Sequence, residues 1–240
     1  MGMQRALALV YPDQCILCPE PVEASGGLCS ACWRDMPFIR GLVCEACGTS
    51  LPGEEDRADV FCDDCMTIAR PWNTGRAALS YRGMARRLIL ALKHGDRPDL
   101  ASPAAEWLER AGGPVLRPDT LLVPVPIHWS RMLSRRYNQS AELCRALSRR
   151  TGIACCPSAL IRTRRTPVQD GLGVDERFTN LLGAVHPHPR RGDLLRDRDV
   201  CLIDDVMTSG ATLSVSSQAC LDAGARRVSV LVLARVEKAP

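Results

Sequence analysis

The sequence contains little lysine, few aromatic residues and no long apolar run. Lysine occurs only as Lys93 and Lys238 among 31 basic residues, and Phe, Trp and Tyr make up 4% of the 240 residues. No stretch reaches the ~20 apolar residues that a membrane-spanning helix needs. The start, MGMQRALALVYPDQC, has one Arg and a short apolar run but no small-residue cleavage site of a secretory signal. We therefore expect a cytoplasmic protein without membrane insertion.

Two familiar nucleotide-binding patterns are also missing. There is no G-x-x-x-x-G-K-[ST] segment, which excludes a P-loop, and the G-x-G at residues 171–173 lacks both a preceding strand and the later glycine of a dinucleotide-binding turn. The four tryptophans are scattered along the chain, which argues against an aromatic stacking platform for single-stranded nucleic acid. These are Trp33, Trp72, Trp107 and Trp129.

Charge is distributed unevenly along the chain. Residues 1–75 carry 5 Arg and 11 acidic residues, a formal charge of −6, whereas residues 76–240 carry 26 basic and 16 acidic residues, a formal charge of +10. The basic part suits anionic partners such as phosphorylated metabolites or nucleic acid. Arg can contact phosphate with two hydrogen bonds at once, which would explain the preference for Arg over Lys. The same preference also results from the codon usage of a GC-rich genome.

Cysteine is abundant and regularly spaced. Two C-x2-C pairs present four thiolates to one tetrahedral metal ion, so eight such cysteines suit two structural Zn²⁺ sites with no position open to substrate. A sequential assignment joins pairs one and two in one site and pairs three and four in the other; an interleaved assignment is compatible with the same spacing. The four pairs, separated by 10, 11 and 14 residues, are Cys15 and Cys18, Cys29 and Cys32, Cys44 and Cys47, and Cys62 and Cys65.

Other interpretations of this segment fit less well. A redox C-x-x-C motif lies at a helix start in a βαβ unit, and none of the four pairs does; the usual iron–sulfur ligand spacings are absent too. Metal binding is expected to supply the folding free energy of so short and acidic a segment. The remaining cysteines are interpreted as small apolar residues in a reducing compartment. They are Cys144, Cys155, Cys156, Cys201 and Cys220.

From residue 76 onward the pattern predicts strands that alternate with helices. Such strands, apolar throughout, are typical of a parallel sheet covered on both faces. The polar stretch 163–198 is expected to be a long flexible excursion. We therefore predict an α/β fold in two domains, a zinc-binding domain (1–75) and a sheet domain (76–240). Strands are expected at 77–81, 120–127, 158–165, 199–203 and 227–236, and helices at 82–93, 103–111, 134–150 and 212–223.

The most informative segment is VCLIDDVMTSGATL, residues 200–213. An apolar strand ends in two carboxylates, Asp204 and Asp205, and a small, hydroxyl-rich loop then opens a helix. Ligands of open α/β sheets bind at the carboxyl ends of strands, and a helix N-terminus with free N–H groups binds phosphate. Carboxylates one step earlier can accept hydrogen bonds from a sugar diol. The combination predicts a sugar-phosphate site, although a plain strand–turn–helix uses the same residue types in its turn and cap.

Residues 200–213 resemble the motif with which type I phosphoribosyltransferases bind phosphoribosyl pyrophosphate (PRPP). The rest of the chain narrows the resemblance to the ComF family of competence proteins, which carry N-terminal zinc ribbons. The resemblance covers nearly the whole chain and implies a type I phosphoribosyltransferase-like sheet domain behind a double zinc ribbon. Besides the cysteine pairs, its carriers are LVYPDQCILC (9–18), ALKHGD (91–96), VPVPIHWSRMLSRRYNQS (123–140), ERFTNLLGAV (176–185) and DDVMTSGAT (204–212).

The resemblance also implies roles for single residues. Asp204 and Asp205 would be the catalytic carboxylates that hold the ribose hydroxyls, with Mg²⁺ held mainly by oxygens of PRPP itself. The segment that binds the ribose and the 5′-phosphate would continue through Val206, Met207, Thr208, Ser209, Gly210, Ala211 and Thr212, with the 5′-phosphate at residues 208–212. The cations available to pyrophosphate would be His128, Arg131, Arg135 and Arg136, although arginines there also suit the solvated face of a helix. A mobile loop over the site would contain Gln169, Arg177 and Asn180.

The sequence leaves the roles of three further residues open. Asn138 and Gln139 match an Asn-Gln pair of the family, and helix capping is their plain alternative. Lys93 either approaches a phosphate or extends its charged end into solvent from an apolar stem.

Two functional hypotheses follow. The first is an enzyme that binds Mg²⁺–PRPP and transfers its phosphoribosyl group with release of pyrophosphate; no segment identifies the acceptor. The second is a binding module that senses PRPP, ribose 5-phosphate or a nucleotide, or that handles single-stranded DNA or contacts DNA-uptake proteins during natural transformation. In either case the zinc segment could act as a platform for protein docking.

Overall fold

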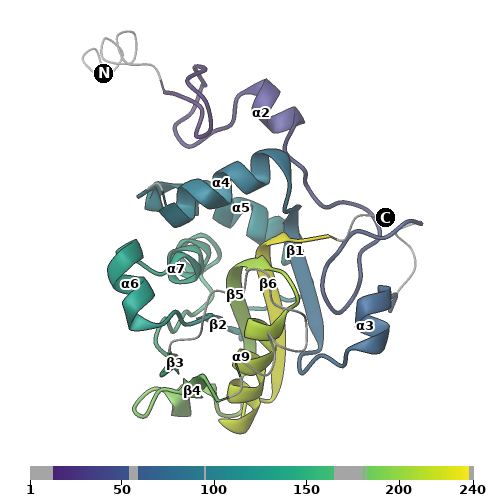
Figure 1. Cartoon of the computed structure of the whole chain (residues 1–240), viewed down its shortest axis with the longest axis vertical. Helices are drawn as coiled ribbons and strands as arrows, with labels where there is room; N and C mark the ends of the chain where they lie inside the picture. Colours follow the sequence, from purple (N-terminus) through teal and green to yellow (C-terminus); the bar gives the residue numbers. More distant parts are fainter. Residues whose placement is uncertain (1–12, 54–58, 95, 165–180, 182, 238–240) are drawn as a thin grey trace.

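The core of the molecule is a four-stranded parallel sheet with strand order β1-β6-β5-β2. The computed structural model describes residues 13–53, 59–94, 96–164, 181 and 183–237 (Figure 1). The two long central strands pair along their whole length, so that Asp204 of β5 lies opposite Val232 of β6. The strands are β1 (Thr74–Ser80), β2 (Leu121–Pro124), β5 (Asp199–Met207) and β6 (Arg227–Arg235).

Helices cover both faces of this sheet. One apolar cluster joins the sheet to α4 (Gly83–His94), α5 (Ala101–Ala111) and α7 (Gln139–Thr151). The other joins its opposite face to α9 (Ala211–Asp222) and to an antiparallel ribbon of β3 (Leu160–Arg162) and β4 (Val185–Pro187). The predicted α/β fold with a parallel, helix-covered sheet is therefore confirmed. Short helices complete the described chain: α2 (Ser30–Arg34), α3 (Asp63–Thr67), η1 (Pro98–Leu100), α6 (Trp129–Arg135) and η2 (Gly192–Leu195).

The structure corrects three expectations about single elements. The helix expected over 134–150 is two helices, α6 and α7, because Arg136 adopts φ 65° and the Asn138 side chain caps α7. The strand expected over 158–165 is short and lies in the β3–β4 ribbon, outside the main sheet. The excursion over 163–198 contains β4 and η2 in its described part.

The N-terminal cysteines form two groups, with the sequential assignment. The first cysteine cluster is Cys15, Cys18, Cys29 and Cys32, and the second is Cys44, Cys47, Cys62 and Cys65; within each, all four sulfurs lie within 4.8 Å of one another. The clusters lie at separate places: α2, which contains Cys32, is next to α4 in Figure 1, and α3, which contains Cys65, is on the side of β1.

The chain between and after these clusters packs directly on β1. Ile39 N donates to Ala78 O (3.0 Å) and Ser80 N to Pro37 O (2.9 Å), which covers the outer edge of the sheet. The second cluster lies closer still to β1. The turn between Cys44 and Cys47, which we call the knuckle, accepts a hydrogen bond from Gly75 N at Glu45 O, and a Cβ at Gly75 would lie 2.2 Å from Ala46 O. Only glycine at position 75 permits this approach. The division into domains 1–75 and 76–240 stays a prediction.

No helix of the described residues combines the length and the apolar character needed to cross a membrane.

Candidate functional site

Two carboxylates stand at the carboxyl end of β5. Ser140, in the first turn of α7, donates its hydroxyl to Asp204 Oδ1 at 2.7 Å, and the Asp205 backbone N–H donates to the same oxygen at 2.9 Å. Burial, together with the negative charge of Asp205, raises the pKa of Asp204 to about 7. Asp204 therefore releases its proton close to neutral pH.

Lys93 provides the counter-charge of the second carboxylate. Its Nζ lies 3.2 Å from Asp205 Oδ1, and both side chains are largely buried. The end of α4 that carries Lys93 is held by Tyr137, whose hydroxyl donates to Leu92 O at 2.6 Å. Lys93 was expected to approach a phosphate or to extend into solvent; in the structure it pairs with a carboxylate.

The predicted phosphate segment forms the turn from β5 into α9. We call residues 208–210 the β5–α9 loop. Gly210 is the N-cap of α9 with φ 82°, and Ser209 Oγ accepts a hydrogen bond from Ala211 N at 3.4 Å. The first turn of α9 contains no acidic residue. Free N–H groups at the start of this 12-residue helix and the adjacent hydroxyls make the loop chemically suited to an anion.

Two arginines that the sequence did not indicate hold this loop from the side of the second cysteine cluster. Arg70 Nη1 donates to Ser209 O at 2.7 Å. Arg235, at the end of β6, donates to Met207 O at 3.2 Å and to Thr208 O at 2.6 Å. Neither arginine lies in a recognisable motif, and Arg70 is 139 residues from its partner in the chain, so no local signal could have identified them.

The predicted pyrophosphate cations lie after β2. His128 is buried and accepts a hydrogen bond from Ser130 N through Nδ1, so that it caps α6. Arg136 is exposed and forms an ion pair with Asp96 (2.6 Å). Arg131 and Arg135 are residues of helix α6. Their role in binding pyrophosphate stays a prediction. Three further predicted loop residues lie outside the described residues: Gln169, Arg177 and Asn180.

The pair that follows α6 has a structural position. Asn138 caps α7 by accepting a hydrogen bond from Ser140 N at 3.1 Å, and it donates to Val125 O at 3.0 Å. This arrangement fixes the helix turn from which Ser140 reaches Asp204. Gln139 beside it is buried.

The cysteine clusters have the geometry of closed zinc sites. Tetrahedral coordination with Zn–S bonds of ~2.3 Å places sulfurs about 3.8 Å apart. Sulfur–sulfur distances are 3.6 Å for Cys18–Cys29 and Cys18–Cys32 and 3.7 Å for Cys47–Cys62. The residues present therefore fit Zn²⁺ at both places, and the ion would supply charge neutralisation and cross-linking rather than catalysis.

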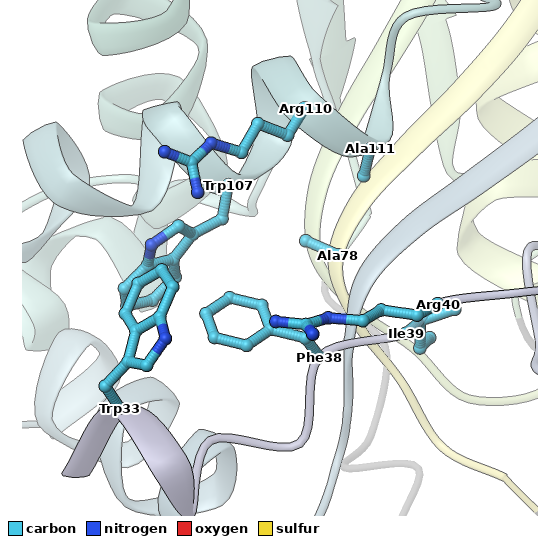
Figure 2. Close-up of a pocket in the computed structure, with 8 residues that line it drawn as sticks. All are labelled: Trp33, Phe38, Ile39, Arg40, Ala78, Trp107, Arg110 and Ala111. Carbon is cyan, nitrogen blue, oxygen red and sulfur yellow. The ribbon is translucent and has the colours of Figure 1, made fainter. Parts of the chain in front are cut away.

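A small pocket lies away from the Asp204–Asp205 pair, between α2 and α5. It encloses about 180 Å³. Figure 2 shows Trp33, Phe38 and Trp107 grouped together, with the Arg40 guanidinium reaching the Phe38 ring and Arg110 beyond Trp107. Ring centroids are 4.9 Å apart for Trp33–Phe38 and 5.6 Å for Phe38–Trp107. Trp33 and Trp107, which lie far apart in the sequence, therefore line one pocket, and each packs against Phe38.

The raised pKa of Asp204 predicts an unusual pH dependence of stability. Between about pH 4 and about pH 7 the folded protein keeps a proton that the unfolded chain, with its aspartate near 3.8, has released. Folded stability contributed by this group is therefore greatest at low pH and falls as the pH rises through that window. We expect the free energy of unfolding of the wild type, minus that of Asp204→Asn, to decrease from about pH 5 to about pH 7.5 and then level off.

Urea unfolding of both proteins at a series of pH values measures this difference. Protonation of the zinc ligands at low pH acts on both proteins alike and cancels in the comparison. A difference that is constant with pH, or that rises, would contradict a raised pKa of Asp204 in the folded protein.

Comparison with solved structures finds phosphoribosyltransferases. A hypoxanthine phosphoribosyltransferase from Staphylococcus aureus has a TM-score of 0.34 at 13% identity, over 59% of this chain and 64% of that one. The allosteric regulatory enzyme of purine biosynthesis has a TM-score of 0.39 at 16% identity, over 60% of this chain and 30% of that one. Superpositions at these scores carry no inference on their own.

Sequence comparison is more informative. Residues 6–66 match the family described as double zinc ribbon domain. The chain is 28% identical over 228 residues to competence protein F of Haemophilus influenzae, across 92% of this chain and 96% of that protein. It is 32% identical over 236 residues to the DNA utilization protein YhgH of Escherichia coli K12, across 95% of this chain and 99% of that protein. With such identity over nearly the full length of both chains, the protein belongs to the ComF/YhgH family and carries its N-terminal double zinc ribbon.

Proposed function

We propose that this protein binds PRPP at the carboxyl end of β5. The observation that supports the proposal is the juxtaposition of the Asp204–Asp205 pair with the β5–α9 loop, since the carboxylates are followed within a few residues by the start of α9. A ribose 5-phosphate unit has this pattern of groups, with a diol and a phosphate separated by the sugar ring. The parallel sheet supplies the edge at which such ligands bind.

Each part of the ligand would meet a different group. The loop N–H groups and the Ser209 and Thr208 hydroxyls would bind the 5′-phosphate. Asp204 and Asp205 would accept hydrogen bonds from the ribose hydroxyls, with Ser140 and Lys93 keeping the two carboxylates in place. Mg²⁺ would neutralise pyrophosphate charge while keeping few protein ligands; the carboxylate oxygens are the hard donors that this ion prefers.

The chemistry open to such a site is transfer of the phosphoribosyl group. The bond between C1 and the pyrophosphate oxygen breaks, the pyrophosphate leaves with the bonding electron pair, and a nucleophilic acceptor forms the new bond to C1. Carboxylates beside the ribose would stabilise positive charge that develops on the ring. Release of inorganic pyrophosphate that depends on an added acceptor would distinguish a transferase from a binding module.

Calorimetric titration of the zinc-loaded chain with four probes tests the proposal. We expect Mg²⁺–PRPP to bind most tightly, ribose 5-phosphate and pyrophosphate more weakly, and ribose not measurably, because the larger ligand combines both anionic groups with the diol. Equal affinity for PRPP and pyrophosphate, or no binding of any probe, would overturn the proposal.

Single-stranded DNA is a second candidate ligand, favoured by the aromatic pocket of Figure 2. Two relatives carry the names DNA utilization protein and competence protein F. Trp33 is 40% exposed, so one ring face could stack with a base. The Arg40 guanidinium lies over Phe38 at 5.7 Å and could meet a neighbouring DNA phosphate.

We expect Trp33→Ala to weaken binding of an oligo-thymidine about 5- to 100-fold, the range for loss of one base–aromatic stack. Trp129→Ala is the matched control, because Trp129 is 65% exposed and lies outside the pocket. Fluorescence anisotropy at two salt concentrations measures both variants, and affinity should fall steeply with salt. Equal effects of the two substitutions would contradict a role for the pocket.

A further inference from the structure

The second cysteine cluster and the β5–α9 loop are connected by two arginine side chains. We propose that Arg70 and Arg235 are positioning residues through which the second cluster, with its zinc ion, shapes the β5–α9 loop for the 5′-phosphate. Affinity for that phosphate and zinc retention at the second cluster are then coupled. This inference deepens the PRPP-binding proposal and rests on it for the identity of the ligand.

Arg70 contacts both partners. Its Nη1 donates to Ser209 O at 2.7 Å, and its side chain also lies against the Cys65 side chain of the second cluster. The guanidinium also lies over the Trp72 ring at 5.4 Å. Trp72 is buried and donates its indole N–H at 2.6 Å to Ala46 O, inside the knuckle between Cys44 and Cys47. Arg70 is thus held against the cluster from two directions.

Gly210 shows how closely the loop packs on this arginine. A Cβ at Gly210 would lie 2.8 Å from Arg70 Nη1 and 3.2 Å from the Trp72 ring, and the residue has φ 82°. The backbone conformation therefore favours glycine where α9 begins, and a Cβ there would displace the Arg70 guanidinium. A shift of Arg70 or Trp72 would change the contact at the N-cap of α9 directly.

Arg235 makes a similar contact with the carbonyl oxygens that precede Ser209. It is 5% exposed, and its Nη1 donates to the carbonyl oxygens of Met207 and Thr208. On its other side Arg235 lines the same pocket as Cys62 of the second cluster. Two positive side chains thus lie between the second cluster and three successive carbonyls.

The charges of the two sides are complementary. Four thiolates and one Zn²⁺ carry a net charge of about −2, and Arg70 and Arg235 together supply +2. The cluster can therefore hold both guanidinium groups in place without leaving a buried charge unbalanced.

Holding the carbonyls also orients the loop N–H groups. In a trans peptide the C=O of one residue and the N–H of the next point in opposite directions, and the described chain has no cis peptide bond. When Thr208 O and Ser209 O face the arginines, the N–H groups of Ser209 and Gly210 face away from them. Those N–H groups are the ones that the proposed function assigns to the 5′-phosphate.

The first cysteine cluster lies elsewhere and serves as the internal comparison. The chain around this first cluster packs on α4, where Arg87 donates to Leu17 O at 3.3 Å. Its apolar residues Ile16 and Met36 belong to the hydrophobic core formed with α4, α5 and α7. Coupling is therefore expected for one zinc ion of the two.

The test compares Arg70→Met, Arg70→Lys and a control in the zinc-loaded full-length chain. Arg34→Met is the control, since Arg34 is an exposed arginine of α2 with the same charge to lose. We expect Arg70→Met to weaken binding of ribose 5-phosphate and PRPP by about 10- to 100-fold, the effect of losing a charge-assisted hydrogen bond, and to leave pyrophosphate affinity unchanged. Arg70→Lys should recover part of the loss, and Arg34→Met should match the wild type.

Zinc release gives the reciprocal measurement. With a chromogenic chelator, bound PRPP should slow release of one zinc equivalent in the wild type and in Arg34→Met but not in Arg70→Met. Similar loss of pyrophosphate and ribose 5-phosphate affinity in Arg70→Met, or protection of both zinc ions alike, would overturn the inference.

Hydrogen exchange separates this inference from the proposed function. In the ligand-free proteins, Arg70→Met should speed amide exchange of residues 208–212, and Arg34→Met should not. If exchange responds in this way while PRPP fails to bind the wild type, the connection stands and the proposed function fails. If exchange is the same in all variants, the connection itself is refuted.

Discussion

Replacement of both carboxylates, in Asp204→Asn/Asp205→Asn, is expected to weaken Mg²⁺–PRPP binding by at least about 100-fold. Each hydrogen bond to a charged group contributes about 1.5–3 kcal/mol, and the double variant loses two carboxylate acceptors at once. The substitution also removes the counter-charge of Lys93, which lies 3.2 Å from Asp205, and so disturbs the arrangement of charges inside the site. The Asn side chains keep the shape of the site, so the fold should persist. Calorimetric titration measures the loss.

Asp222→Asn is the control for this experiment. Asp222 is exposed at the far end of α9 and accepts a hydrogen bond from Gln218, so its replacement makes the same Asp→Asn change once without touching the proposed site. Both variants should contain two zinc equivalents and show the circular dichroism of the wild type. Wild-type affinity in the folded double variant would place PRPP elsewhere on the molecule.

Loss of the second cysteine cluster is expected to be the most damaging change to stability. Cys44 and Cys47 are fully buried, and the knuckle that they form lies against Gly75 of β1 and beneath Trp72. Zinc binding in small zinc domains contributes about 10–16 kcal/mol, which is comparable to the whole stability of a typical domain. Cys44→Ser should therefore remove one zinc equivalent and broaden or abolish the cooperative unfolding of the sheet.

Cys18→Ser is the matched comparison in the first cluster. Cys18 is partly exposed, and its loss should release the other zinc equivalent, loosen residues 13–36 and leave a cooperative transition for the sheet. Zinc analysis and differential scanning calorimetry measure both effects. Equal loss of cooperativity in the two variants would contradict the different packing of the two clusters.

The sequence predicted those features that local patterns determine. The spacing of C-x2-C pairs predicted the cysteine clusters, the repeated apolar runs predicted β5 and β6, and the Asp204–Asp205 pair followed by small hydroxyl residues predicted the turn into α9. In each case the residues that act together are close in the chain, so their spacing alone restricts their geometry.

Contacts between distant segments could not be predicted in this way. Arg70 and Ser209 are 139 residues apart, and Ser140 is 64 residues from Asp204. Trp33 and Trp107 are 74 residues apart and come to one pocket only because both pack against Phe38. The expected helix over 134–150 is broken at Arg136, and Tyr137 beside the break donates to Leu92 O of another helix, a contact that spacing along the chain does not show.

These long-range contacts also bear on the organisation of the chain. The zinc segment could have been a separate docking platform attached to the sheet. In the structure its knuckle reaches β1, and Arg70, which follows its last cysteine, reaches the β5–α9 loop. Removal of residues 1–75 would therefore delete contacts of the proposed site and the first two residues of β1, Thr74 and Gly75.

A crystal structure of the zinc-loaded protein with Mg²⁺–PRPP tests the central claim most directly. It should place the 5′-phosphate within hydrogen-bond distance of the N–H groups of Ser209 and Gly210, and the ribose hydroxyls on Asp204 and Asp205. Arg70 and Arg235 should retain their bonds to the loop carbonyls. PRPP bound away from the carboxyl end of β5, or a β5–α9 loop empty at saturating PRPP, would contradict the claim.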